Sequence, residues 1–286
     1  MGVRHATEAD LDAIVRLVDG EQVQPNRHIA YLGSDTESIR IDIVAIEDWP
    51  AHTVVSAGAS GSIDGCLLAE VDADMGRCWW WGPFVDADDW AGTADALYTA
   101  APEGGVTPEQ ELAPDDRNLM TAEFALRHGF HQETASAVLT YTGPNFGSGD
   151  GAVRPAAEWK DEVAALHDLL FPGTHTTGRA LVGSDDIRLV FVESEAFGGY
   201  VAAEVNSDGS GYIDFLGVVP DTRGRGIGRR LVMAAVDALR ERGATSVDLT
   251  VREDNHAARR LYASLDFTEE RLVRPYRKGF TLEPRS

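Results

Sequence analysis

Cysteine and lysine are scarce in this sequence, and long apolar runs are absent. Its two cysteines, Cys66 and Cys78, cannot build a disulfide framework or a cysteine-ligated zinc site. Lys160 and Lys278 are the two lysines, so arginine carries almost all the positive charge. No apolar run reaches the ~18 residues that a membrane-spanning helix needs. Residues 1–6 lack the apolar centre of an export signal, so we expect a cytoplasmic protein without a membrane partner.

Basic residues are also few relative to acidic ones. The chain holds 25 Lys and Arg against 47 Asp and Glu, a net charge of −22. Because binding of nucleic acid requires a basic surface, this balance argues against a nucleic-acid partner, and it permits a cationic substrate. The deficit is uneven. Residues 1–150 hold 7 basic and 26 acidic side chains, whereas residues 151–286 hold 18 and 21, so a site for an anionic ligand is expected in the second half.

The two halves of the sequence resemble each other. At 286 residues the chain exceeds the usual size of one hydrophobic core, so two domains are expected. The matched segments are Val3–Glu8 with Val153–Glu158, Gly65–Val71 with Gly199–Val205, and the pair Asn118 and Phe130 with the pair Asn255 and Phe267. We interpret them as two copies of one domain. Glycine and proline cluster between the copies, which predicts domains at 1–142 and 152–286 joined by a linker at 143–151.

The second copy has a clear pattern of strands and helices. Asn206–Ser210 is a turn-forming segment, so the strands on either side of it are expected to form an antiparallel hairpin. The predicted strands are Ile187–Glu193, Gly199–Val205, Gly211–Val219, Ser246–Val251 and Glu270–Tyr276, and the predicted helices are Gly228–Arg242 and Asn255–Leu265. Strands and helices in this mixture predict an α/β domain.

A glycine-rich turn joins the strand Tyr212–Val219 to the helix that follows. The turn, Pro220–Gly228, contains three glycines and is flanked by further arginines. Glycine lets backbone N–H groups approach an anion closely, and the first amides of a helix add partial positive charge, so the turn predicts a phosphate cradle. The pattern lacks the Gly-Lys-Ser/Thr of a P-loop and the glycine spacing of a dinucleotide fingerprint.

This segment resembles the acetyl-CoA signature of the GNAT superfamily of N-acetyltransferases, Arg/Gln-x-x-Gly-x-Gly/Ala. Arg223, Gly226 and Gly228 occupy its defined positions. Downstream, Asn255–Phe267 resembles the family's Asn…Ala…Leu-Tyr…Gly-Phe segment, with Asp266 where the family has glycine. Two motifs in the right order are far more specific than either alone. The resemblance covers about residues 150–280 well and 1–142 weakly.

The resemblance implies two tandem GNAT-like domains, each a mostly antiparallel, splayed sheet flanked by helices. Acetyl-CoA would be the cosubstrate. Backbone groups of Val218 and Val219 would bind the pantetheine chain, and a backbone N–H there would face the thioester oxygen. Backbone N–H groups of the turn would hold the pyrophosphate. The complete set of expected cofactor-binding residues is Val218, Val219, Arg223, Gly224, Arg225, Gly226, Ile227, Gly228, Arg229 and Asn255.

The reaction that the resemblance implies is transfer of an acetyl group to a primary amine of a small molecule. Tyr262 stands where the family places its general acid. The general base is left open between Asp214 and Glu204, with Glu253 and Asp254 as further carboxylates near the same strands. The loop at 171–179 often lines the acceptor site in this family, so its two charged or titratable side chains, His175 and Arg179, are candidates to face the substrate.

The first copy lacks this chemistry. After its counterpart strand, Arg77–Val85, three aspartates (Asp86, Asp88 and Asp89) stand where the second copy has arginines. Ala125 falls at the position of Tyr262. We therefore expect a degenerate domain that binds no CoA and that packs on the second domain, walls the acceptor site or forms a homodimer. The alternative function for the whole chain is a non-catalytic acyl-CoA sensor or interaction module.

Overall fold

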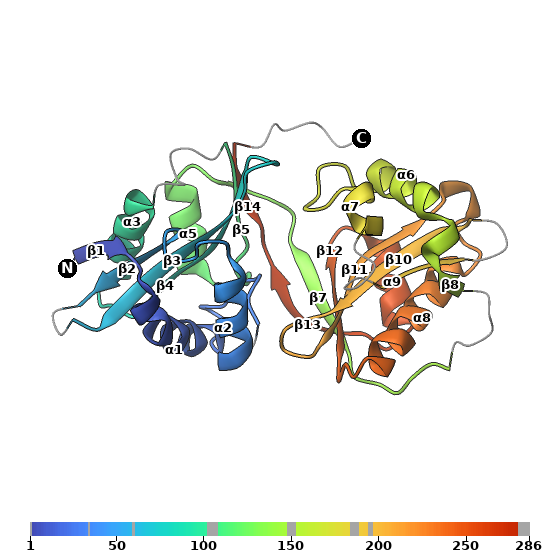
Figure 1. Cartoon of the computed structure of the whole chain (residues 1–286), viewed down its shortest axis with the longest axis horizontal. Coiled ribbons are helices and arrows are strands. Elements are labelled where there is room, and N and C mark those ends of the chain that lie inside the picture. Colours follow the sequence, from blue (N-terminus) through green and yellow to red (C-terminus); the bar gives the residue numbers. More distant parts are fainter. Residues whose placement is uncertain are drawn as a thin grey trace. The chain divides into compact units, whose positions relative to one another are not determined.

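Strands and helices alternate along both halves of the chain, as the sequence predicts. The computed structural model describes residues 2–33, 35–58, 61–101, 108–147, 153–183, 189–193 and 197–279. The chain divides into two units, one made of residues 1–136 with 271–286 and the other of residues 137–270. Each unit contains a mixed sheet with helices on both faces (Figure 1).

The first half of the chain begins with a strand and a helix and ends with a strand. Its elements are β1 (Gly2–His5), α1 (Leu11–Gln22), α2 (Thr36–Ala45), β2 (Thr53–Ala57), β3 (Ile63–Asp72), β4 (Arg77–Val85), α3 (Trp90–Ala100), β5 (Glu109–Leu112), α5 (Leu119–Arg127), β6 (His131–Gln132) and β7 (Ser136–Tyr141).

The second half repeats this order. Its elements are β8 (Val153–Pro155), α6 (Lys160–Leu170), α7 (Gly178–Gly183), β9 (Leu189–Glu193), β10 (Gly199–Val205), β11 (Gly211–Val218), α8 (Ile227–Glu241), β12 (Val247–Arg252), α9 (His256–Ala263), β13 (Thr268–Val273) and β14 (Tyr276–Lys278). The predicted antiparallel hairpin is confirmed, because β10 and β11 pair from Gly199–Val218 to Val205–Gly211. The first two residues of the predicted strand at 187–193 lie outside the described residues.

The predicted strand at 270–276 is two strands in the structure. β13 ends at Val273 and β14 begins at Tyr276, with Arg274 and Pro275 between them. Proline has no N–H to donate, so it interrupts a strand ladder at this point. The interruption separates two segments that belong to different sheets.

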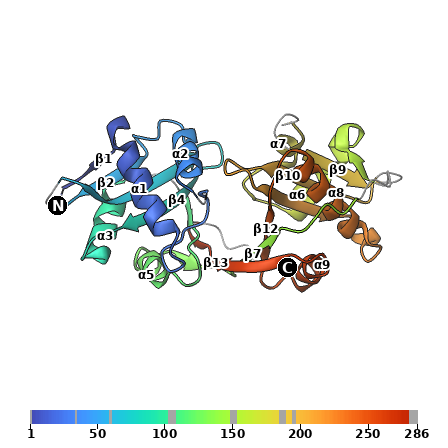
Figure 2. The same ribbon diagram turned by 90° about the horizontal axis from the view of Figure 1, so that it is seen from below.

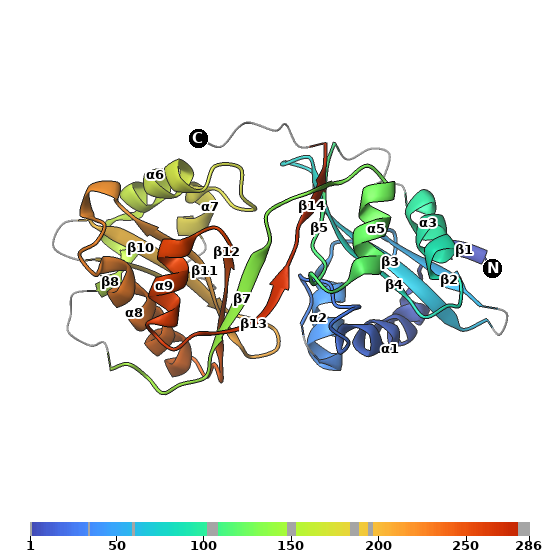
Figure 3. The ribbon, with the colours of Figure 1, turned by 180° about the vertical axis from the view of Figure 1, so that it is seen from behind.

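The last strand of each copy is exchanged between the two sheets. The first sheet has the order β1-β2-β3-β4-β5-β14-β6, and the second has β8-β9-β10-β11-β12-β7-β13. Strand β7, from the first half of the sequence, therefore lies between β12 and β13 of the second sheet (Figures 2 and 3). Strand β14, from the second half, lies between β5 and β6 of the first sheet and pairs antiparallel with both.

This exchange explains why the units do not coincide with the ranges expected from sequence. The described part of the expected linker, 143–147, follows β7, and residues 148–151 lie outside the described residues. Gly143 accepts a hydrogen bond from the Arg240 guanidinium on α8 at 2.9 Å, and the Phe146 N–H donates to Asp237 at 2.6 Å. The segment that looks like a linker in the sequence is thus bonded to the second unit.

Apolar side chains from both faces of each sheet form the cores. In the first unit, α1 and α2 cover one face and α3 and α5 the other (Figure 1). Of the three consecutive tryptophans on β4, Trp80 packs toward α3, Trp81 packs on the opposite face and Trp79 is partly buried beside the same core as Trp81. The two cysteines are buried, as expected from their place on strands.

In the second unit, α6 and α7 cover one face and α8 covers the other (Figures 1 and 3). The apolar stripe predicted for α8 is buried along its whole length: Leu231, Val232, Ala235, Val236 and Leu239 are each fully inaccessible. Gly243 follows the helix with a φ of 96°, a conformation that glycine adopts without steric cost. The amphipathic pattern therefore fixes which face of α8 meets the sheet.

A carboxylate on the fifth strand of each sheet binds the exchanged strand. In the second unit, the Thr140 hydroxyl on β7 donates to Asp248 on β12 at 2.6 Å. In the first unit, Arg277 on β14 donates to Glu111 on β5 at 2.6 Å. Burial raises the pKa of Asp248, and the Thr140 hydrogen bond acts in the opposite direction.

We predict that Thr140→Val lowers the free energy of unfolding by about 1–2 kcal/mol, because it leaves the half-buried Asp248 carboxylate without this donor. Chemical denaturation of the full chain measures the effect. Thr142→Val is the matched control, since Thr142 is exposed on the same segment. Equal stability of the Thr140 variant and the wild type would show that this bond does not hold the exchanged strand.

Candidate active site

The fourth and fifth strands of the second sheet are paired over only part of their length. The parallel ladder joins Gly211–Ile213 of β11 to Val247–Leu249 of β12. Both strands continue beyond this ladder, β11 to Val218 and β12 to Arg252. All residues of both strands are described by the structure. A bulge falls at the end of the ladder, because Ala202 pairs with Phe215 and Ala203 with Ile213, which leaves Asp214 as the extra residue. The strands part at Asp214.

The turn after β11 has backbone angles that fit the predicted phosphate cradle. Gly224 and Gly226 have φ angles of 78° and 77°, in the left-handed region that glycine tolerates. Gly226 is the N-cap of α8, and no side chain caps this helix end. The first N–H groups of a helix have no acceptor within the helix, so this end presents backbone donors and the positive end of the helix dipole.

Arginine side chains surround the cradle. Arg229 reaches across to α9 and donates to the Ser264 carbonyl at 3.1 Å and to the Ser264 hydroxyl at 2.9 Å. Arg223 donates to the Val218 carbonyl at 3.3 Å, and Arg230 donates to the Arg225 carbonyl at 3.3 Å. The guanidinium groups thereby add fixed positive charge to the end of α8 that already favours an anion.

Gly228 lies where α8, α9 and β11 approach one another. A Cβ at this position would sit 3.4 Å from Leu261, 3.6 Å from Val218 and 3.7 Å from Leu216. These are ordinary packing distances, so an added methyl group would occupy space beside the strand rather than clash with it. Glycine here keeps that space open next to the backbone expected to bind the pantetheine chain.

Tyr262 projects from α9 into the interior and is 6% exposed. Its pKa is raised, chiefly by burial and then by the neighbouring Tyr212. The phenol is therefore protonated at neutral pH and able to donate a proton, as a general acid must. Asp266, the departure from the family pattern, has a φ of 62° and takes up the left-handed conformation that the usual glycine would adopt.

Polar side chains gather on the sheet around Tyr212. Glu204 on β10 pairs directly with Tyr212, and Asp248 on β12 pairs with it from the other side. Burial raises the pKa of Tyr212 to about 12, and Asp214, Glu204 and Asp248 act in the same direction, while a hydrogen bond with Thr250 lowers it. This part of the sheet is therefore strongly negative.

The structure brings His175 to Asp214, a contact that sequence reasoning did not anticipate. His175 Nε2 lies 3.2 Å from Asp214 Oδ2, although the two residues are 39 positions apart. Arg179, the other candidate from this loop, is exposed on α7. Glu253 is exposed after β12, and Asp254 is paired with Arg252 at 2.7 Å. The sequence does not predict the His175–Asp214 pair, because the loop and the bulge come together only when the unit folds.

The corresponding region of the first unit is arranged differently. Asp89 caps α3 by accepting a hydrogen bond from the Gly92 N–H at 3.0 Å, so a side chain of the chain itself occupies this helix end. Glu21 is 7% exposed, and burial raises the pKa of its carboxyl group. The Val85 N–H donates a hydrogen bond to this carboxyl group and acts on its pKa in the opposite direction. Val85 pairs with Gly65 as Val218 pairs with Gly199, so this N–H is the counterpart of the one on Val218.

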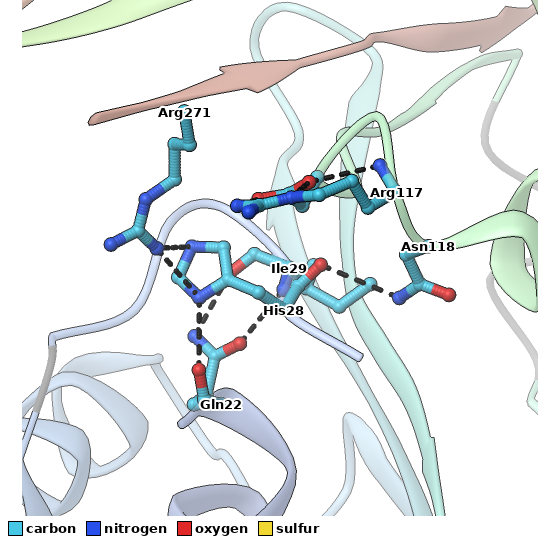
Figure 4. A network of polar contacts seen from close by, with 7 residues as sticks. Gln22, His28, Ile29, Arg117, Asn118 and Arg271 are labelled. Carbon is cyan, nitrogen blue, oxygen red and sulfur yellow. Dashed lines mark hydrogen bonds and ion pairs between the residues drawn. The ribbon is translucent and has the colours of Figure 1, made fainter. Parts of the chain in front are cut away.

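The α1–α2 loop fills the space beside the fifth strand of the first sheet. The Ala30 N–H donates to the Ala113 carbonyl at 2.9 Å, and the Asp115 N–H donates to the His28 carbonyl at 3.0 Å. The Gln22 amide bonds both backbone groups of Ile29, at 2.7 and 2.8 Å (Figure 4). Ile29 is fully buried. The loop thus continues the ladder of β5 in the first sheet. Among the described residues, β12 of the second sheet has no corresponding loop partner.

Arg271 completes this network. Its guanidinium contacts the His28 ring at 2.6 and 2.9 Å (Figure 4). Burial, and after it the charge of Arg271, lower the pKa of His28 to about 4. His28 is therefore neutral at physiological pH, which is the state that tolerates an adjacent arginine.

Comparison with known proteins agrees with this geometry. Residues 158–267 match the acetyltransferase (GNAT) family. This match lies within the second half of the chain. A mycothiol acetyltransferase from Rhodococcus jostii is 29% identical over 93% of this chain and 80% of its own length. A mycothiol acetyltransferase from Saccharopolyspora erythraea is 41% identical, but that match spans 24% of this chain and 23% of the relative.

Solved structures share the GNAT fold across both halves. A GCN5-related N-acetyltransferase from Sphaerobacter thermophilus superimposes with a TM-score of 0.75 at 19% identity, covering 97% of this chain and 95% of the other. A tandem GNAT protein from the clavulanic acid biosynthesis pathway gives 0.66 at 12% identity, covering 99% and 100%. At these identities the likeness concerns the fold. No helix among the described residues has the length and apolar character to cross a membrane.

Asn255, expected to contact the cofactor, is the N-cap of α9. Its side chain accepts from the Ala258 N–H at 3.1 Å, and Asn118 caps α5 of the first unit in the same way through Thr121, also at 3.1 Å. We predict that Asn255→Ala lowers the free energy of unfolding by about 1 kcal/mol, and that Asn255→Ser retains most of the stability. Denaturation curves measure both, with Asn118→Ala as the equivalent change in the other unit.

The same variants test the expected contact between Asn255 and acetyl-CoA. If the side chain acts only as a cap, acetyl-CoA affinity by titration calorimetry stays within about twofold at a temperature where Asn255→Ala is fully folded. A tenfold loss of affinity would show a direct contribution to cofactor binding.

Proposed function

We propose that this chain transfers an acetyl group from acetyl-CoA to a primary amine of a small molecule, by direct attack within a ternary complex. The observation that carries the proposal is the combination, in one unit, of an uncapped helix N-terminus behind Gly224 and Gly226 and a β11–β12 ladder that ends early. The family match over residues 158–267 supports it independently. The activated acetyl thioester is what acetyl-CoA supplies to the reaction.

The residues of the second unit have distinct roles in this proposal. The backbone N–H groups at the start of α8, with Arg223 and Arg225, bind the pyrophosphate. The backbone of Val218 and Val219 aligns the pantetheine chain, and an N–H there polarises the thioester carbonyl, a contact worth ~3 kcal/mol in a dry site. Holding both reactants in one orientation contributes a further ~7–11 kcal/mol. Tyr262 gives its proton to the leaving sulfur.

The negative sheet surface around Tyr212 supports a cationic acceptor. Glu204, Asp214 and Asp248 approach this side chain from three strands. An amine is positively charged in water at neutral pH, so these carboxylates would raise its local concentration. The names of the curated relatives put amines related to mycothiol among the first acceptors to examine.

The first unit is proposed to bind no acetyl-CoA. Asp89 caps its helix, Glu21 faces the Val85 N–H, and Ala125 replaces the tyrosine. Each of these differences removes a separate part of the cofactor site: the anion cradle, the backbone donor and the acid.

We expect isothermal titration with acetyl-CoA to give one site per chain, and the double variant Gly226→Asp with Gly228→Asp to abolish binding, because two carboxylates would enter the cradle. The matched control is Gly209→Asp, in an exposed turn of the same unit. Two sites per chain would show that the first unit also binds the cofactor. Binding without acetylation of any amine would instead favour the acyl-CoA sensor, and an absence of binding would remove the proposal.

We expect Tyr262→Phe to lower kcat at least a hundredfold while the KM for acetyl-CoA changes less than threefold, because the ring still packs and only the proton donor is lost. Thiol release and mass spectrometry of the acetylated amine measure the rate. The control is Tyr141→Phe, whose hydroxyl donates to the Pro144 carbonyl. An unchanged kcat would exclude Tyr262 as the acid.

A further inference from the structure

We propose that His175 is the general base that takes the proton from the acceptor amine, and that Asp214 is its positioning residue. The inference rests on the proposed acetyl transfer and gives His175 a role that the family resemblance does not. It rearranges the roles open from sequence, where Asp214 and Glu204 were the candidate bases and His175 only a residue of the substrate loop.

His175 and Asp214 differ in exposure, as expected if the histidine meets the substrate and the aspartate only positions it. The Asp214 side chain is 7% exposed and the His175 side chain is 48% exposed, and Nε2 of the histidine faces the carboxylate at 3.2 Å. A buried carboxylate that accepts from one imidazole nitrogen fixes the tautomer and leaves the other nitrogen able to accept a proton. The exposed histidine, rather than the buried aspartate, can therefore reach a substrate.

Several contacts hold the histidine ring in this orientation. The ring stacks on Phe215, with centroids 5.2 Å apart and an interplanar angle of 24°. On the C-terminal side of the loop, the Thr176 carbonyl lies 3.2 Å from His167 Nε2. On its N-terminal side, the Thr174 hydroxyl donates to the Phe171 carbonyl at 3.0 Å. The segments before and after His175 are therefore both held by hydrogen bonds, which fixes the position of this residue.

The pair stands at the point where β11 and β12 separate. The ladder between them ends at Ile213 and Leu249, and Asp214 is the bulged residue that follows. Tyr262, the proposed acid, interacts with Tyr212 on the strand two residues before Asp214. Acid and base therefore come from different elements that meet near the same end of the ladder, as a direct transfer between two substrates requires.

The neighbouring titratable groups do not compete for the role. Asp168, Asp214 and His175 all act on His167 of α6. His167 is fully buried, and both of its ring nitrogens are engaged, with Tyr200 at 2.7 Å and with the Thr176 carbonyl. Burial lowers its pKa, so it remains neutral. Asp168 accepts from the Gly178 N–H at 2.7 Å and so helps to hold the end of the loop.

The proton balance of the reaction closes with these two side chains. The ammonium form of the acceptor loses one proton to the unprotonated His175 nitrogen, directly or through a water, and His175 passes it to solvent. The amine lone pair then forms the C–N bond as the C–S bond breaks. The sulfur takes the Tyr262 proton, and the second proton of the nitrogen leaves through His175 and solvent, which restores Tyr262. One proton is released for each acetyl group transferred.

The wild-type chain is first assayed with glucosamine, spermidine and ethanolamine to find the amine that it acetylates fastest. With that amine, the test compares the rates of His175→Gln, Asp214→Asn and Glu204→Gln in the full chain with the wild-type rate. We expect His175→Gln to lower kcat/KM by 10²–10³-fold at pH 7 and to remove the rising limb that a general base gives to the pH–rate profile. Asp214→Asn should lower kcat about tenfold, retain that limb and leave KM within threefold. His131→Gln, exposed on β6, is the control.

Two further measurements separate failure of this inference from failure of the proposed function. Imidazole in the buffer should restore activity to His175→Ala and not to Tyr262→Phe, and acetyl-CoA affinity should stay within twofold in every variant. Normal turnover and an unchanged pH profile in His175→Gln, or their loss only in Glu204→Gln, would overturn the assignment while acetyl transfer stands. A wild-type chain that binds acetyl-CoA and acetylates no amine would overturn both.

Discussion

The early end of the ladder between the fourth and fifth strands is the constraint on which the rest of the structure depends. Backbone groups that leave a ladder need other partners, because an unpaired buried N–H or C=O costs free energy. In the first unit the chain supplies them itself, through the loop at Ile29 and Ala30 that bonds beside Ala113. In the second unit the corresponding loop carries His175 to Asp214 instead. The two copies therefore differ in loop placement at the point where the proposal puts the acceptor substrate.

The exchange of β7 and β14 makes the two copies dependent on each other. Neither half of the sequence contains all the strands of its sheet, since each lacks the strand between its fifth strand and its edge. Polar contacts accompany the exchange on both sides, with Thr140 on Asp248 and Arg277 on Glu111. Removal of residues 1–142 would take β7 out of the sheet that carries the site and expose the edge of β12. The degenerate copy is thus a structural part of the candidate active unit even if it binds nothing.

Local features of the site could be predicted from sequence, and features that depend on long-range pairing could not. The cradle is local, since its glycines and the helix that follows lie within one short segment, and the amphipathic face of α8 fixes how that helix packs. The cap at Asn255 is local too, because the side chain bonds to an N–H of the helix that it begins. The domain limits expected from sequence differ from the limits of the compact units. The reason is that the sequence of a strand does not indicate which sheet the strand joins. The His175–Asp214 contact depends on a bulge, which alternation of apolar residues does not reveal.

The matched positions of the two copies separate the requirements of folding from those of chemistry. Asn118 and Asn255 cap equivalent helices, and Gly129 and Asp266 both take positive φ after them, so the geometry that sets the helix and the next strand is kept. Tyr262 and Ala125 occupy the same place on those helices, and both are buried. The second copy thus has a phenol, and the first a methyl group, at a position where the helix and its cap are otherwise alike. The helix of the first copy forms without the hydroxyl, which agrees with the proposed role of Tyr262 as proton donor.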